Sequence, residues 1–181
     1  MTAGNERNAA PDRMVVMGVA GSGKSSVGEA LAASIGAVYI DGDALHPPAN
    51  IEKMSKGIAL TDEDRLPWLL EIGRMLRGDA GNRLIIGCSA LKRSYREAIS
   101  REAGHRVMFI YLAGTRQVIA ERIRKRAGHF MPVSLLDSQF AALEEPHPDE
   151  NAIRINIDQP FGDLIRTATT LLGATQAPGR T

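Results

Sequence analysis

The residues with the clearest chemical meaning form a glycine-rich segment after the first apolar run. Gly18-Val19-Ala20-Gly21-Ser22-Gly23-Lys24-Ser25 fits G-x-x-x-x-G-K-[ST] at every required position, and it follows Met14–Met17. Glycines let backbone N–H groups approach phosphate oxygens, and a helix beginning near Lys24 adds its positive end. We expect Lys24 to reach the β- and γ-phosphates of ATP and Ser25 to offer its hydroxyl to magnesium (Mg²⁺). The segment, with Ser26 behind it, predicts a nucleoside-triphosphate site.

A P-loop of this kind does not by itself specify the reaction. The Asn-Lys-x-Asp tetrapeptide that GTPases use for guanine is absent from the sequence. The third apolar run ends Ile85-Ile86-Gly87-Cys88-Ser89, without the acid that closes a typical Walker-B strand. The nearest acids at a strand end are Asp41 and Asp43. This pattern favours a compact small-metabolite kinase over a switch or motor, and a nucleotide-binding regulatory protein stays as the alternative from another class.

An insertion from residue 41 onward carries the candidate acceptor side. Asp41 and Asp43 flank Gly42 at the expected end of a strand. We expect Asp41 to face the metal and Asp43 to position the acceptor hydroxyl and take its proton. The alternative is that the triplet forms a solvated turn. His46 either hydrogen-bonds a substrate hydroxyl or caps the loop.

Arg65 is the candidate cation for a substrate carboxylate. Its guanidinium can hold a carboxylate through two hydrogen bonds, or it can pair with Asp62 or Asp64. Thr61 is typical of an N-cap, and the acids that follow it suit a helix start. A structural role therefore accounts for those acids, while the role of Arg65 stays open at this stage.

Short apolar runs alternate with helically spaced segments along the whole chain. The runs are Met14–Met17, Ala37–Ile40, Leu84–Gly87, Val107–Leu112 and Ala152–Ile157. The helical segments are Lys24–Ile35, Leu66–Leu76, Leu91–Ile99, Val118–Arg126, Val133–Leu143 and Leu164–Leu172. Continuous apolar runs suit parallel strands covered on both faces, and ligands bind at the carboxyl edge of such a sheet. The pattern predicts an α/β fold with an open, mostly parallel sheet.

Bulk properties exclude several classes of protein. The chain has 181 residues, a formal net charge of +1 and one cysteine, Cys88. This length suits one domain, and the charge gives no reason to expect nucleic acid or an acidic membrane. No apolar run approaches the length of a spanning helix, the first 13 residues lack a signal-peptide core, and one cysteine excludes an intrachain disulfide. We expect a cytoplasmic protein with a loose tail at residues 1–13.

The acceptor insertion, read with other segments, resembles the gluconate kinase family of P-loop sugar-acid kinases. The resemblance rests on DGDALHPPANIEKMSKGIALTDEDRLPWL (residues 41–69) together with GVAGSGKSSVG, CSALKRSYRE, FIYLAG, GHFMPVSLLDSQFAALEEP and IDQP. It covers residues 14–172, and its acceptor pattern is far more specific than the P-loop.

The resemblance implies a function and an architecture. It implies transfer of the ATP γ-phosphoryl to the 6-hydroxyl of D-gluconate, with Mg²⁺; a kinase for another small hydroxy acid, such as shikimate, is the alternative within the class. It also implies a three-layer α/β/α fold like that of shikimate kinase, with a five-stranded parallel sheet, and a homodimer. We expect one domain over residues 14–173 and a tail at 174–181, with the acceptor insertion at about 41–64 and a mobile lid at about 122–132.

Four further residues complete the expected site. Lys92 follows the third strand, where it can meet the sugar acid or a phosphate, or lie at a solvated helix start. Gln139 is expected to contact the acceptor from the resemblance alone. Arg122 and Arg126 share a helix face. Similarity to related kinases implies that Arg122 lies against adenine and that Arg126 reaches the transferring phosphoryl group, where charge develops.

Overall fold

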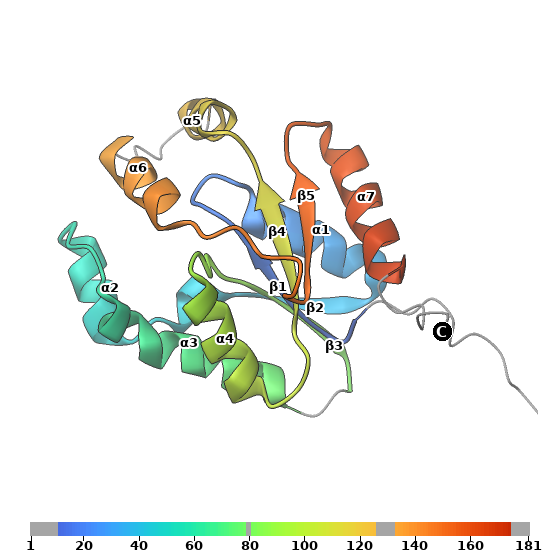
Figure 1. The fold of residues 1–181 in the computed structure, drawn as a ribbon, viewed down its shortest axis with the longest axis horizontal. Coiled ribbons are helices and arrows are strands. Elements are labelled where there is room, and N and C mark those ends of the chain that lie inside the picture. The colour runs from blue at the N-terminus through green and yellow to red at the C-terminus, as the bar shows by residue number, and fades with distance from the viewer. Residues whose placement is uncertain (1–10, 79–80, 126–132, 175–181) are drawn as a thin grey trace, which may run out of the picture.

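Strands and helices alternate along the chain in the computed structural model, which describes residues 11–78, 81–125 and 133–174 (Figure 1). The strands are β1 (Arg13–Met17), β2 (Ala37–Asp41), β3 (Arg83–Gly87), β4 (Met108–Ala113) and β5 (Ala152–Asn156). The helices are α1 (Lys24–Ile35), η2 (Gly42–Leu45, a 3₁₀ helix), α2 (Pro48–Ser55), α3 (Asp62–Arg77), α4 (Arg93–Ala103), α5 (Arg116–Lys125), α6 (Val133–Ala142) and α7 (Phe161–Ala174).

The five strands form one parallel sheet in the order β2-β3-β1-β4-β5. Successive residues of the central strand β1 face opposite sides of this sheet. Met14 and Val16 pack in one hydrophobic cluster, whereas Val15 and Met17 pack in a second cluster. Residues 14–17 have no exposed surface, as expected for a strand covered on both faces. The predicted five-stranded parallel sheet is confirmed.

Helices form a layer on each face of the sheet (Figure 1). Leu31 of α1 and Leu172 of α7 are buried in the first cluster, and Trp68 of α3 and Ile99 of α4 are buried in the second. These layers make the predicted three-layer α/β/α architecture. The carboxyl ends of β1, β2 and β3 meet at one edge, where Val16 and Asp41 both pair in register with Gly87. The P-loop and the acceptor insertion both start from this edge.

Several element boundaries differ from the sequence expectation. The first strand starts at Arg13, a residue that the sequence places in the tail. Arg13 is fixed in the strand because its guanidinium is buried and donates to Leu76 O (2.8 Å) and Gly78 O (2.6 Å) at the end of α3. Carbonyls at a helix end need such donors. The last helix begins at Phe161 rather than Leu164, because the Pro160 carbonyl accepts the first helical N–H groups.

The long insertion after β2 is ordered by two short helices. η2 and α2 occupy much of residues 41–64, and Pro48 opens α2 at the first helical position, where its missing N–H costs nothing. Part of the expected lid lies in α5, which runs to Lys125, while residues 126–132 lie outside the described part of the chain, as do residues 1–10 and 175–181 of the expected tails.

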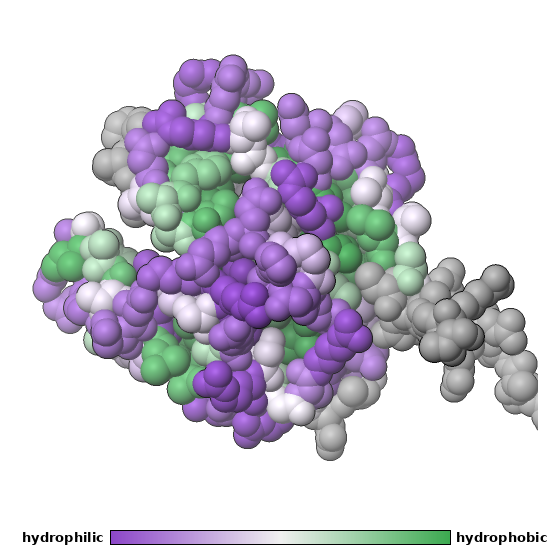
Figure 2. Space-filling view, in the orientation of Figure 1, coloured by the Kyte–Doolittle hydropathy of each residue, from purple (hydrophilic) through white to green (hydrophobic). Residues whose placement is uncertain are grey.

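The surface in the view of Figure 2 is mostly hydrophilic. Hydrophobic residues gather at the tip of α2, where Ile51, Met54 and Ile58 are 43–51% exposed. Among the described residues, no helix combines the length and apolar character needed to cross a membrane.

Candidate active site

The P-loop turns from β1 into α1 through backbone conformations that favour glycine. Gly21 has φ 80° and Gly23, the N-cap of α1, has φ 97°. A side chain at Gly21 would also place its Cβ 2.5 Å from Ile123 Cγ1 of α5. The loop is therefore closed from outside by α5, and Lys24, Ser25 and Ser26 form the first turn of α1. Backbone N–H groups at this helix end provide the predicted cradle for an anion.

Lys24 lies across the loop that precedes it. Its ammonium donates to Gly18 O (3.2 Å) and Val19 O (3.3 Å). Burial lowers the pKa of Lys24, while the negative charges of Asp43 and Asp41 oppose that shift. No described carboxylate forms an ion pair with this ammonium. The loop thus holds a half-buried cation through neutral carbonyls, which leaves its charge available for phosphate oxygens.

Arg122 connects the P-loop to the segment that follows β5. Its guanidinium donates to Ile157 O and lies 3.5 Å from Ser22 O. Ile157 follows the end of β5, so Arg122 links the P-loop to the segment after this strand. Contact with adenine itself stays a prediction. Arg126, the other candidate arginine, lies outside the described residues.

Asp41 and Asp43 lie where β2 ends at the carboxyl edge of the sheet. Asp41 caps η2, and its Oδ1 accepts the Asp43 N–H at 3.1 Å. Both residues are exposed, and their charges act on Lys24. Asp41 and Asp43 therefore lie close enough to Lys24 for their charges to interact, and their roles toward metal and acceptor stay predictions.

His46 is built into a small buried cluster of the insertion. Its ring stacks on Trp68 with centroids 4.0 Å apart, and Trp68 Nε1 donates to Gly42 O (2.7 Å). Asn50 Nδ2 donates to Asp64 O (2.8 Å) and lies 3.3 Å from His46 Nδ1. Since this amide nitrogen only donates, Nδ1 accepts and the proton sits on Nε2. Burial lowers the pKa of His46, with the charge of Asp43 opposing that shift and the charge of Arg65 adding to it. The neutral ring packs in this cluster and keeps one N–H donor.

Arg65 keeps its charge available at the start of α3. Thr61 caps this helix in a reciprocal capping box with Asp64, which confirms the predicted N-cap. Asp64 pairs with Lys53 at 2.7 Å, and Asp62 pairs with Lys92 at 2.7 Å. Within the described parts of the chain, no side chain or carbonyl accepts a hydrogen bond from the Arg65 guanidinium. The alternative that Arg65 pairs with these acids is therefore wrong, and its half-buried cation is free for a carboxylate.

Lys92 is engaged within the protein, which differs from its expected role toward the acceptor. Its ammonium pairs with Asp62 and lies 5.5 Å from the centre of the Tyr95 ring. The Tyr95 hydroxyl donates to the same carboxylate. Because α3 packs against α4, the acid in the first turn of α3 meets the residues at the start of α4. A contact between substrate and Lys92 would require this pair to open.

Gln139 contacts the P-loop, while its expected contact with the acceptor stays a prediction. Its Oε1 accepts the Ala20 N–H at 2.6 Å, which places the α6 side chain directly on the P-loop. Ala20 and Gln139 are 119 positions apart in sequence. The sequence around Gln139 does not predict this contact, because its neighbours show only the spacing of an ordinary helix.

Two further side chains that shape the site were missed by sequence reasoning. The Tyr39 ring packs where a Cβ at Gly28 would lie 2.2 Å from Cε2, so α1 approaches β2 closely only because residue 28 is glycine. Arg96 is 1% exposed and pairs with Glu150 (2.6 Å) while donating to Ala90 O (3.1 Å). Ala90 has φ 43°, and this hydrogen bond holds its left-handed conformation in the loop before Lys92.

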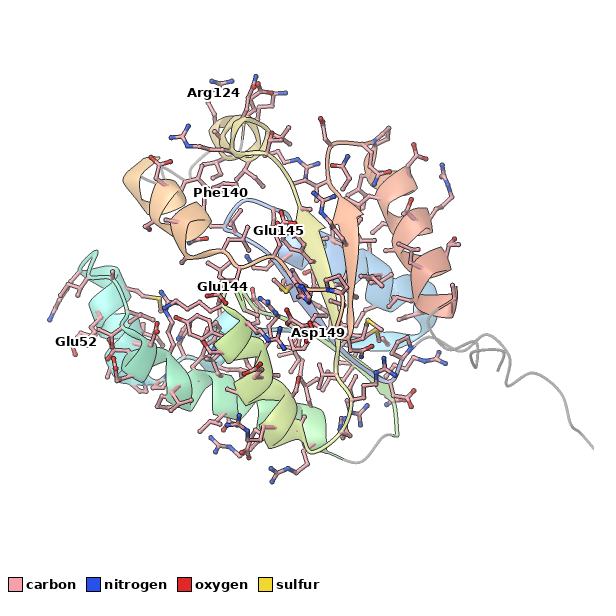
Figure 3. All side chains as sticks on the ribbon, viewed as in Figure 1. Glu52, Arg124, Phe140, Glu144, Glu145 and Asp149 are labelled. Carbon is pink, nitrogen blue, oxygen red and sulfur yellow. The ribbon has the colours of Figure 1, made fainter. Side chains whose placement is uncertain are left out.

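Figure 3 shows how the segment from α6 to β5 runs beside α4, with Glu144, Glu145 and Asp149 along it. Glu144 N donates to Leu91 O (2.9 Å), and its carboxylate accepts the Arg93 N–H (2.6 Å). Arg93 also pairs with Asp149 at 2.8 Å. The loop from β3 to α4 is thereby fixed from the α6 side.

The donor set fits a magnesium ion held mainly by phosphates. Ser25 lies in the first turn of α1 and Asp41 ends β2, so one hydroxyl and one carboxylate are available at the sheet edge. Across the described ranges, no group of three or more His, Cys, Asp or Glu side chains could hold a metal. Mg²⁺ bound with a nucleotide needs only one or two protein ligands in addition to phosphates and water.

Comparisons with known proteins show the relatives of this chain. A family model described as an AAA domain matches residues 14–146. The thermosensitive gluconokinase of Escherichia coli K12 is 45% identical over 163 residues, which cover 86% of this chain and 84% of that protein. The gluconokinase of Gluconobacter oxydans 621H is 49% identical over 148 residues, which cover 81% and 83%.

A solved structure gives the same result for the fold. The crystal structure of a gluconokinase from Sinorhizobium meliloti 1021 matches with a TM-score of 0.85 and 48% identity, over 93% of this chain and 95% of that one. The identities and coverage are high enough to show the family as well as the fold. This chain belongs to the gluconokinase family.

Proposed function

We propose that this kinase transfers the γ-phosphoryl group of ATP to the 6-hydroxyl of D-gluconate, forming 6-phospho-D-gluconate and ADP. The observation that supports the proposal is a P-loop lysine at the sheet edge whose charge interacts with Asp41 and Asp43, with the unpaired Arg65 near enough for its charge to act on His46 and Cys88. The acceptor insertion supplies both carboxylates, and it begins the segment at residues 41–69 that is most typical of the family.

The donor half of the site binds the triphosphate. Backbone N–H groups of the P-loop and the first turn of α1 hold phosphate oxygens, and Lys24 places its charge on the β- and γ-phosphates. Ser25 and Asp41 are the side chains that would hold Mg²⁺, which when bound neutralises charge on the phosphate oxygens. Arg122 borders the adenine end.

The acceptor half holds the sugar acid. The Arg65 guanidinium binds the substrate carboxylate, and the Nε2–H of His46 is available to a hydroxyl. Asp43 orients the 6-hydroxyl and accepts its proton as the oxygen attacks the γ-phosphorus. The bond between the γ-phosphorus and the bridging oxygen breaks, and ADP leaves with that electron pair. Arg126 is proposed to stabilise the charge that develops on the phosphoryl group.

A coupled assay of ADP release tests the proposal with gluconate, shikimate, other sugar acids and AMP as acceptors. We expect gluconate to raise the rate far above ATP hydrolysis and Lys24→Ala to remove most of that rate. Turnover with another acceptor and none with gluconate would overturn the substrate assignment. ATP binding without acceptor-dependent turnover would instead identify a regulatory protein.

We also propose that the chain forms a homodimer, as the family resemblance implies. Light scattering on the purified protein tests this point, with twice the mass of one chain as the expected result. The mass of a single chain at assay concentrations would contradict it.

A further inference from the structure

One peptide unit of the P-loop is held from both of its sides. The Val19 carbonyl accepts the Lys24 ammonium (3.3 Å) and the Ser22 N–H (3.2 Å). The N–H of the same unit, carried by Ala20, donates to Gln139 Oε1 at 2.6 Å. No described peptide bond is cis, and the C=O and N–H of a planar trans unit point in opposite directions. Lys24 and Gln139 therefore form hydrogen bonds with opposite sides of one peptide unit.

Gln139 lies on α6, which packs against the protein through contacts other than the hydrogen bond to Ala20. Leu136 of α6 is 3% exposed and belongs to the same hydrophobic cluster as Val19. Asp137, the next residue, pairs with Arg116 of α5 at the surface. In Figure 1 the loop between β1 and α1 extends toward α6. The Gln139 side chain is half-buried, and its oxygen accepts the hydrogen bond from the P-loop.

We propose that Gln139 is a positioning residue for the donor half of the site. Its carboxamide oxygen sets the orientation of the Val19–Ala20 peptide, and through the Val19 carbonyl it sets the position of the Lys24 ammonium. The inference rests on the proposed function, because it assigns Gln139 to ATP and not to the acceptor. Without this oxygen the Ala20 N–H loses its hydrogen-bond partner, and the Val19–Ala20 peptide rotates so that this N–H faces water. The Val19 carbonyl then turns away from Lys24, whose ammonium loses one of its two acceptors.

The test uses Gln139→Met, which keeps an unbranched side chain of similar length but lacks a strong acceptor. Gln139→Ala is measured beside it, so that the result does not depend on one substitution folding well. Asp137→Asn is the matched control, since it weakens the attachment of α6 to α5 without touching the P-loop. Thermal unfolding verifies that each variant is folded.

Titration calorimetry with ATP and Mg²⁺, in the absence of acceptor, is the main readout. We expect both Gln139 variants to bind about tenfold more weakly, the order expected for one lost hydrogen bond in a loop. KM for ATP should rise in parallel and KM for gluconate should not change. Amide exchange followed by NMR should be faster at Ala20 and unchanged at Leu31.

Three results would overturn the inference. They are unchanged ATP affinity in the Gln139 variants, a rise confined to KM for gluconate, and an equal loss of ATP affinity in Asp137→Asn. The calorimetric readout does not depend on the acceptor. If the native protein binds ATP but shows no turnover with gluconate, the proposed function fails while the titration still decides the role of Gln139.

Discussion

Replacing Glu150 by alanine should destabilise the protein far more than replacing its neighbour Asp149. Glu150 accepts two hydrogen bonds from Arg96, at 2.6 and 2.9 Å, and the two side chains are only 10% and 1% exposed. Asp149 pairs with Arg93, but those side chains are 54% and 45% exposed. Both arginines lie on α4, so the two substitutions differ mainly in burial.

The magnitude follows from the charge that each substitution leaves behind. Without Glu150, the guanidinium of Arg96 stays buried with only carbonyl partners, a situation that costs about 3–5 kcal/mol. At about 2–4 °C per kcal/mol for a domain of this size, Glu150→Ala should lower Tm by roughly 6–20 °C. Arg93 without Asp149 returns to water, so Asp149→Ala should change Tm little.

Differential scanning calorimetry of both variants and the native protein measures these shifts. The contact with Arg96 lowers the pKa of Glu150, so the stabilisation is complete above the usual glutamate pKa of about 4.5 and is lost as pH falls through the lower folded value. The difference between native protein and Glu150→Ala should therefore shrink below about pH 4.5. Equal losses in both variants at neutral pH, or a difference that stays constant into strong acid, would refute the reasoning.

Three other outcomes follow from the geometry. Arg65→Ala should raise KM for gluconate about 10- to 100-fold, because a charged hydrogen-bonded pair is lost, and KM for ATP should not change. Initial rates measure both constants, and unaltered kinetics would remove Arg65 from the site. Thr61→Ala should cost about 1 kcal/mol in urea unfolding by removing the capping box, and an unshifted midpoint would contradict that role. Burial raises the pKa of the Cys88 thiol to about 12, so an aromatic disulfide reagent should modify it only in denaturant; rapid labelling of the folded protein would show an accessible thiol.

Structural features that depend on neighbouring residues could be predicted from the sequence. The P-loop, the strands and the Thr61 cap each depend on a few neighbouring positions, because glycine conformations, apolar runs and caps are local properties. The two acids at the end of β2 were also placed correctly at the sheet edge, since parallel strands end at a common edge.

Side-chain partners that come from distant elements could not be predicted. Lys92 pairs with Asp62, 30 positions away, and Gln139 reaches Ala20, 119 positions away. Such contacts depend on how α3 meets α4 and on where α6 lies beside the P-loop, and neither packing arrangement follows from residue spacing. The sequence therefore predicted a chemically suitable lysine and glutamine without indicating which partners hold them.

The most direct test of the account is the identity of the product formed from ATP and D-gluconate. Phosphorus NMR of the completed reaction should show one phosphomonoester for each ADP. Its signal should be split into a triplet, because the phosphate oxygen is attached to the CH₂ group at carbon 6. A doublet would place the phosphate on a secondary hydroxyl, and inorganic phosphate alone would mean that no acceptor is used; either result would contradict the proposed reaction.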